Sequence, residues 1–113
     1  MKDGKPERIQ LQRTRGWRIR QAMSVARPTR WGNPYRWEDY RADYPEADDA
    51  ELRRLAVSDF RNGIIERRFI HGEVPDYPVS EIVLLRGHDL ACWCPLDGAC
   101  HADVLLEIAN RQR

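Results

Sequence analysis

The chain has 113 residues, of which 42% are hydrophobic and 33% are charged. This composition is typical of one globular domain and excludes an intrinsically disordered chain. No apolar run approaches the roughly 20 residues that a membrane span needs, and the polar start MKDGKPERIQ offers no signal sequence. We therefore expect a cytoplasmic protein with no membrane segment, whose cysteines stay reduced.

The net charge of +1 conceals an uneven distribution along the chain. Lys and Arg predominate in residues 1–41, whereas Asp and Glu predominate in residues 42–113. A basic segment suits an anionic partner such as a nucleotide or a nucleic acid, although pairing of the two halves on one surface would explain the same split. The charge pattern leaves both interpretations open.

Short apolar runs predict three strands in a small α/β domain that follows a polar arm at residues 1–7. Residues 8–15 alternate between apolar and polar side chains, which is typical of a half-exposed strand. Residues 23–26 form a second apolar run, and residues 89–94 form a third that predicts a buried strand. We expect residues 8–113 to form a single sheet with helices packed on it.

Hydrophobic periodicity predicts three helices. The first extends from Pro45 to about Arg68 and carries one apolar stripe. The second covers residues 79–86, with Ser80 as its cap and Gly87 as its stop. The third follows a turn at residues 95–98. Connecting segments are expected at residues 38–44, as a loop or lid, and at residues 72–78, as a linker.

The segment of residues 27–35 contains two prolines, a glycine and an asparagine, which predicts a shaped loop. Arg30 beside Trp31 offers a positive charge next to a stacking plane, which suits a nucleotide. Asn33 offers an amide for a base edge or a ribose, and Arg27 offers a second positive charge. The alternative is a rigid turn whose Trp31 fills the core.

All three cysteines lie in the C-terminal strand–turn–helix unit. Cys92, Cys94, Cys100 and His101 together provide as many soft or borderline ligands as tetrahedral zinc needs. The spacing matches no standard zinc pattern, and the adjacent Cys100 and His101 are expected to diverge at the helix start. A cysteine in an apolar strand is also commonly a small core residue. Structural zinc and buried thiols therefore remain alternatives.

Two further interpretations concern the same turn. Cys94 or Cys100 would be a nucleophilic or redox-sensitive thiol with His101 as its base, because a helix N-terminus lowers the pKa of a thiol. Alternatively, the free N–H groups of residues 98–102 would form an anion cradle that His101 and Arg30 complete. The sequence does not decide between these interpretations.

Motifs along nearly the whole chain resemble one family. The RIQL of residues 8–11, the WGNP of residues 31–34, the CWC of residues 92–94 and the CHADVL of residues 100–105 together resemble domain of unknown function 4326. That family occurs in actinobacteria and their phages. The cysteine–histidine element has a weaker likeness to domain of unknown function 488, which has an α/β fold. The resemblance implies no particular activity. It makes us expect the loop of residues 27–35, which we call the WGNP loop, to face the turn that ends in residues 100–103, which we call the CHAD turn, across a pocket.

We therefore expect a protein that binds a nucleotide-like or nucleic-acid ligand. If the protein is an enzyme, we expect its reactive groups at the CHAD turn. Arg30 would bind the anion, and Asn33 would position the ligand. His101 would act as acid or base, and Asp103 would orient it or would be an ordinary first-turn acid. The competing hypothesis is a non-enzymatic module stapled by zinc, which contacts nucleic acid or a host protein.

Overall fold

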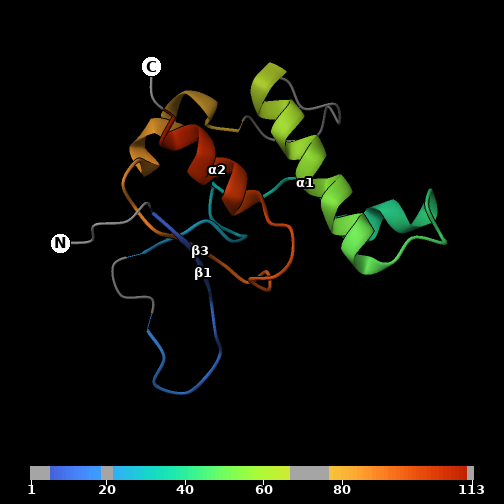
Figure 1. Ribbon diagram of the computed structural model, residues 1–113, viewed down its shortest axis with the longest axis horizontal. Helices are drawn as coiled ribbons and strands as arrows, with labels where there is room; N and C mark the ends of the chain where they lie inside the picture. The colour runs from blue at the N-terminus through green and yellow to red at the C-terminus, as the bar shows by residue number, and fades with distance from the viewer. Residues whose placement is uncertain (1–5, 19–21, 67–76, 112–113) are drawn as a thin grey trace.

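A short parallel sheet joins segments from the two ends of the chain (Figure 1). In this computed structural model, β1 (Arg8–Gln10) and β2 (Met23–Ser24) both pair in parallel with β3 (Leu90–Cys92), so that the strand order is β1-β3-β2. The N–H of Leu11 extends the ladder by donating to the carbonyl of Cys92 at 2.8 Å. The expected α/β class is confirmed. The structure describes residues 6–18, 22–66 and 77–111.

The strands are shorter than the apolar runs predicted. β3 ends at Cys92, before the turn that contains Pro95, and therefore offers no partner for the rest of the predicted strand at residues 8–15. Residues 12–15 are exposed, and Gly16 adopts a positive φ of +88° in the turn that follows. Strand length in this sheet is thus set by the central strand, because a strand needs a neighbour to satisfy its backbone groups.

The longest element is α1 (Asp49–Glu66), which packs through its predicted apolar stripe. Asp48 caps this helix, because its Oδ1 accepts a hydrogen bond from the N–H of Glu51 at 2.8 Å. The predicted end near Arg68 lies outside the described residues. The buried residues of the helix are Leu52, Ala56, Phe60, Gly63 and Ile64, whereas Leu55 is only half-buried.

The acidic segment at residues 38–44 is not the expected loop or lid. It forms most of the 3-10 helix η1 (Trp37–Ala42), which docks against α1 (Figure 1). The hydroxyl of Tyr40 donates to Oδ2 of Asp59 at 2.5 Å. Burial and then this hydrogen bond raise the pKa of Tyr40 above its ordinary value. The prediction was wrong because the contact that holds η1 is made with a distant helix and leaves no local periodicity.

The helix α2 (His101–Ala109) lies over the sheet and contacts both α1 and the 3-10 helix η2 (Val79–Leu85) (Figure 1). Gly87 follows η2 with a φ of +82°, which confirms the predicted stop. Its N–H donates to Oδ1 of Asn110 at 2.9 Å, which connects η2 to the end of α2. Ser80 lies inside η2 and does not cap it.

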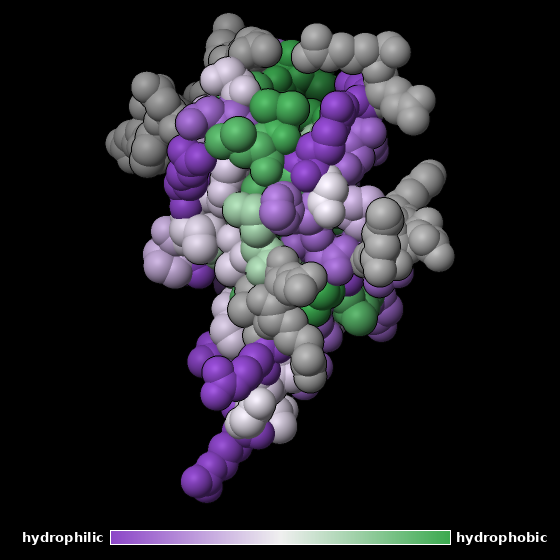
Figure 2. Space-filling view, turned by 90° about the vertical axis from the view of Figure 1, so that its left-hand side faces the viewer, coloured by the Kyte–Doolittle hydropathy of each residue, from purple (hydrophilic) through white to green (hydrophobic). Residues whose placement is uncertain are grey.

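The surface of η2 is partly hydrophobic. Val83 and Leu84 are 53% and 57% exposed. Figure 2 faces this side of the molecule and shows hydrophobic residues in its upper half, surrounded by hydrophilic ones. Among the described residues, no helix combines the length and the apolar composition that crossing a membrane requires.

Candidate functional site

A cavity of about 460 Å³ lies where α1, the WGNP loop and the cysteine-bearing turn meet. Its lining includes Asn33 of the WGNP loop, Cys100 and His101 of the CHAD turn, and Arg53 and Val57 of α1. This volume is within the range of sites that bind small molecules. The two motifs of the sequence therefore contribute to one hollow.

Three arginines and no carboxylate line the cavity. The arginines are Arg13, Arg27 and Arg53, and none of them forms an ion pair with a carboxylate in the described part of the chain. Nη1 of Arg27 donates to the backbone carbonyl of Asn33 at 2.6 Å, so the loop holds this guanidinium in place. The cavity lining consequently has a positive charge that no carboxylate of the lining neutralises.

Aromatic rings lie beside two of these arginines. Cζ of Arg13 lies 4.5 Å from the centroid of the Trp93 ring, and Cζ of Arg53 lies 4.8 Å from the centroid of the Trp37 ring. Both tryptophans line the cavity, as does Tyr35. Stacking on an aromatic face restrains a guanidinium and leaves its N–H edge available. The cavity lining therefore combines positive charge with flat aromatic surface.

Within the WGNP loop, only some of the predicted ligand-binding residues reach the cavity. Arg27 and Asn33 line it, whereas Arg30 and Trp31 do not. Trp31 is 5% exposed and belongs to the core, in agreement with the alternative interpretation of this residue. Arg30 does stack on Trp31, with its Cζ 4.7 Å from the ring centroid, but its Nη1 lies 3.0 Å from Oε2 of Glu81 and forms an ion pair with it. Arg30 and Trp31, which were predicted to bind a nucleotide together, thus lie outside the cavity lining.

The side chain of Asn33 binds the loop to α1. Its Nδ2 donates to the carbonyl of Ala56 at 3.4 Å, and its Oδ1 accepts the N–H of Tyr35 at 2.8 Å. At Gly32 the chain passes so close to Arg27 that an added Cβ would lie 2.6 Å from its Cγ. The composition of the loop therefore shapes the cavity wall.

The sulfur atoms of Cys92, Cys94 and Cys100 lie within 4.8 Å of one another, and this thiol cluster could hold a metal ion. Cys92 Sγ and Cys94 Sγ are 3.8 Å apart. Cys100 Sγ lies 3.8 Å from Nδ1 of His101, so the expected divergence of these two side chains is wrong. The reason is that Cys100 precedes α2 with an extended backbone (φ −151°, ψ 143°) and is not yet part of the helix.

Hydrogen bonds couple the three thiols. Hydrogen bonds with Cys100 and then Cys94 lower the pKa of the Cys92 thiol far below its ordinary value. The hydrogen bond with Cys92, the one with Cys94 and burial raise the pKa of the Cys100 thiol. Sequence reasoning singled out Cys94 and Cys100 as reactive thiols, whereas the thiol whose pKa these hydrogen bonds lower is that of Cys92.

His101 is buried, and both of its ring nitrogens have partners. Nε2 lies 2.8 Å from the carbonyl oxygen of Val25, and Nδ1 faces Cys100. The imidazole also packs edge-on against Phe60, with 5.4 Å between the ring centroids. Asp103 is a partner of neither nitrogen and does not orient this ring, contrary to the role expected for it.

Asp103 instead pairs with Arg8, whose Nε lies 3.3 Å from Oδ1 of Asp103. The side chain of Arg8 is 8% exposed, and its Nη2 donates to the carbonyls of Leu96 and Gly98, both at 2.8 Å. The N–H of Gly98 donates to Pro95 within the turn, so it is not a free donor of the predicted anion cradle. Arg8, which the sequence did not single out, thus holds the turn.

Comparison with known families adds one finding. The family model described as Domain of unknown function (DUF4326) matches residues 9–111, which include the WGNP loop and the CHAD turn. No curated protein matches the chain, and no solved structure does. Because the family model covers nearly the whole chain, the protein belongs to the family described as Domain of unknown function (DUF4326).

Proposed function

We propose that the cavity binds a small anionic ligand that carries a flat heterocycle, such as a nucleotide. The observation that supports this proposal is the combination of three arginines, no carboxylate and several aromatic rings in one lining. Guanidinium groups bind phosphate oxygens through paired N–H donors. Aromatic side chains stack on the flat face of a nucleotide base, and this contact is possible with any of the bases.

Arg13 and Arg53 are the best candidates for the phosphate contacts. Within the described residues neither guanidinium donates a hydrogen bond to the protein, and each is stacked on a tryptophan. Arg27 contributes a fixed positive charge, since one of its nitrogens is already bound to the loop. Both nitrogens of His101 have partners within the protein, and we therefore propose ligand binding without assigning a catalytic step.

Titration of the full chain with nucleoside mono-, di- and triphosphates tests the proposal, with tryptophan fluorescence or calorimetry as the readout. We expect Arg53→Gln to weaken binding about tenfold or more, because a hydrogen bond to a charged group contributes about 1.5–3 kcal/mol. Arg54→Gln is the matched control, because Arg54 is the next residue of α1 and is exposed. Absence of binding by the unsubstituted chain, or equal losses in both variants, would contradict the proposal.

A non-enzymatic binding module held together by zinc is the second candidate function, which the thiol cluster favours. In this case zinc would stabilise the fold, and the basic surface would contact nucleic acid or a partner protein. Titration of the zinc-loaded chain with a single-stranded oligonucleotide separates the two candidates. Salt-dependent binding that free nucleotides do not compete for, and that Arg53→Gln does not weaken, supports the module; competition by nucleotides supports the cavity.

A further inference from the structure

The sulfur atoms of the thiol cluster are spaced like ligands of one tetrahedral metal. Two sulfurs that each lie about 2.3 Å from a tetrahedral zinc are about 3.8 Å apart. Cys92 Sγ and Cys94 Sγ are separated by 3.8 Å, and all three sulfurs lie within 4.8 Å of one another. If the sulfur atoms moved by about 1 Å or less, all three distances between them would match those around one tetrahedral zinc ion.

His101 offers a fourth donor beside the cluster. A carbonyl oxygen only accepts hydrogen bonds, so the 2.8 Å contact with Val25 assigns the ring proton to Nε2. In the zinc-bound ring the lone pair would lie on Nδ1, which is 3.8 Å from Cys100 Sγ. Metal-bound histidines commonly donate their other ring N–H to a backbone carbonyl, as this one does. The edge-on contact with Phe60 holds the ring in this orientation.

Arg8 supplies a positive charge beside the cluster. Three thiolates and one divalent zinc ion leave a net charge of about −1, which is costly to bury without a partner. The Arg8 side chain is 8% exposed and interacts electrostatically with Cys94. Its Nη1 is buried and has no hydrogen-bond partner among the residues that the structure describes. A buried donor without an acceptor is costly, and an anionic metal complex next to it would remove that cost.

We propose that one zinc ion binds in the wall of the cavity, held by the three cysteines and by Nδ1 of His101, with Arg8 as its buried counter-charge. Thiolate and imidazole ligands in a tetrahedral arrangement favour zinc over the harder divalent cations. The inference rests on the second candidate function, because both need zinc at the cysteines. To the ligand set that the sequence named, it adds the orientation of His101 and the counter-charge of Arg8. Its test does not require nucleotide binding, although the zinc ligands and the three arginines belong to one cavity lining.

Elemental analysis and zinc-edge X-ray absorption of the reduced, full-length chain test the ligand set directly. We expect one zinc per chain, with three sulfur neighbours at about 2.3 Å, one nitrogen at about 2.0 Å and the outer-shell scattering of an imidazole ring. Replacement of zinc by cobalt(II) should give the visible absorption of a tetrahedral site and thiolate-to-cobalt charge transfer. These measurements need no substitution, so they do not depend on whether a variant folds.

Substitutions then assign the individual roles, with zinc affinity measured by competition with a chromophoric chelator. Even outer-sphere partners contribute about 10–100-fold to metal affinity, so we expect His101→Gln to weaken zinc binding by at least about 100-fold. The matched control is His88→Gln, because His88 is exposed and should leave the affinity unchanged. Arg8→Gln should weaken binding about 10–100-fold while the cobalt spectrum keeps its tetrahedral bands, since the ligands themselves are retained.

Two results would overturn the inference, and they differ in their consequences. Fewer than stoichiometric zinc in a chain with fully reduced thiols would remove the site and the second candidate function together. Stoichiometric zinc without imidazole scattering, or equal affinity in His101→Gln and His88→Gln, would remove His101 as a ligand and leave the zinc-stabilised module standing. Neither result affects nucleotide binding at Arg53, which is measured separately.

Discussion

At the scale of single residues, Gly32 illustrates how the loop shapes the cavity. A Cβ at this position would lie 2.6 Å from Cγ of Arg27, and also 3.1 Å from its Cα and 3.2 Å from its backbone nitrogen. A side-chain atom can rotate away, but the two backbone atoms can move only with the loop. The requirement for glycine in WGNP is therefore steric, and it fixes the position of an arginine that lines the cavity.

We expect Gly32→Ala to lower the free energy of unfolding by about 1–3 kcal/mol, the usual cost of forcing an extra methyl group into a packed site. The displaced Arg27 should also weaken nucleotide binding. Denaturant unfolding and nucleotide titration measure the two effects. Gly98→Ala is the control, because a Cβ there meets only the Pro95 carbonyl oxygen at 3.6 Å, an ordinary contact. Equal free energies of unfolding for the two variants would contradict the steric requirement for glycine at position 32.

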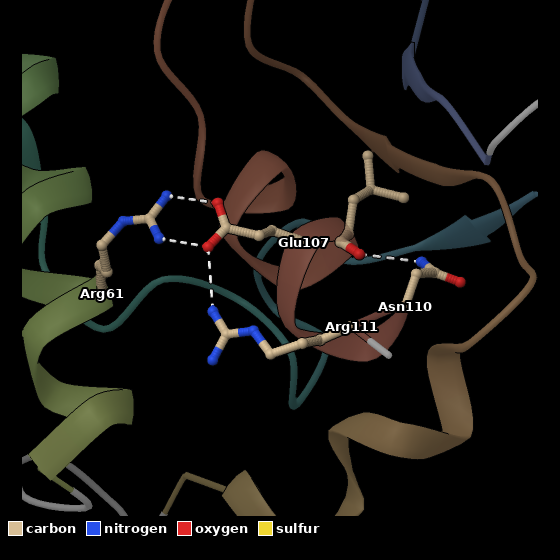
Figure 3. Close-up of polar contacts among 5 residues, drawn as sticks. Arg61, Glu107, Asn110 and Arg111 are labelled. Carbon is tan, nitrogen blue, oxygen red and sulfur yellow. Dashed lines mark hydrogen bonds and ion pairs between the residues drawn. The ribbon is translucent and has the colours of Figure 1, made fainter. Parts of the chain in front are cut away.

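At the scale of elements, an ion-pair network joins α1 to α2 (Figure 3). Nη1 and Nη2 of Arg61 on α1 donate to the two carboxylate oxygens of Glu107 on α2, at 2.8 Å and 3.1 Å. Arg111 adds a contact of 3.1 Å to the same carboxylate. The hydrogen bond with Arg61 is the main cause that lowers the pKa of Glu107. The Glu107 side chain is 48% exposed, so solvent screens much of this interaction.

We expect Glu107→Gln to lower the free energy of unfolding by less than about 1 kcal/mol at neutral pH. Because the pKa of Glu107 is lower in the folded state, its contribution is present above the ordinary pKa of the carboxyl group and is lost as the pH falls through the folded value. Unfolding free energies of wild type and variant should therefore converge in acid and in high salt. Glu38→Gln, on η1, is the control: Glu38 is exposed, so this substitution should leave the free energy of unfolding unchanged at every pH and salt concentration tested. A difference that persists in acid would exclude the electrostatic explanation.

At the scale of the whole molecule, the thiol cluster lies where the central strand β3, the turn and α2 meet. A metal at this point would join the sheet to the helix that covers it. Since Leu90 and Ala91 of β3 and Leu105 of α2 are fully buried, this junction is also the centre of the core. Loss of the metal should consequently affect the cooperative unfolding of the entire domain.

Removal of zinc by a chelator under reducing conditions should lower the Tm by about 10–20 °C. A ligand at 100 times its Kd stabilises the native state by about 2.7 kcal/mol, and each kcal/mol shifts the Tm of a domain of this size by about 4–8 °C. Thermal unfolding followed by circular dichroism measures the change. Arg53→Gln should show the same decrease, because Arg53 belongs to the nucleotide proposal alone. An unchanged Tm after complete chelation would contradict a structural metal.

Much of the local structure was predictable, because its causes lie within a few residues. The stripe of Leu52, Ala56 and Phe60 predicted α1, and Gly87 predicted the end of η2. The run of strand, turn and helix around the cysteines was likewise predicted from apolar pattern and turn residues. The 3-10 helix η1 was missed, since Tyr40 is held by Asp59 of a distant helix and not by its own neighbours.

The sequence by itself determined the α/β class, the positions of the main helix and the central strand, and the two motifs that line the cavity. Only the tertiary structure decided which side chains meet there. It placed Arg27 in the lining and Arg30 against Glu81, and it brought Arg53 of α1 to the cavity. It also paired Arg8 of β1 with Asp103, beside the turn that carries the cysteines. The physical reason is that parallel strand pairing and helix docking join segments far apart in the chain, and local periodicity contains no record of such partners.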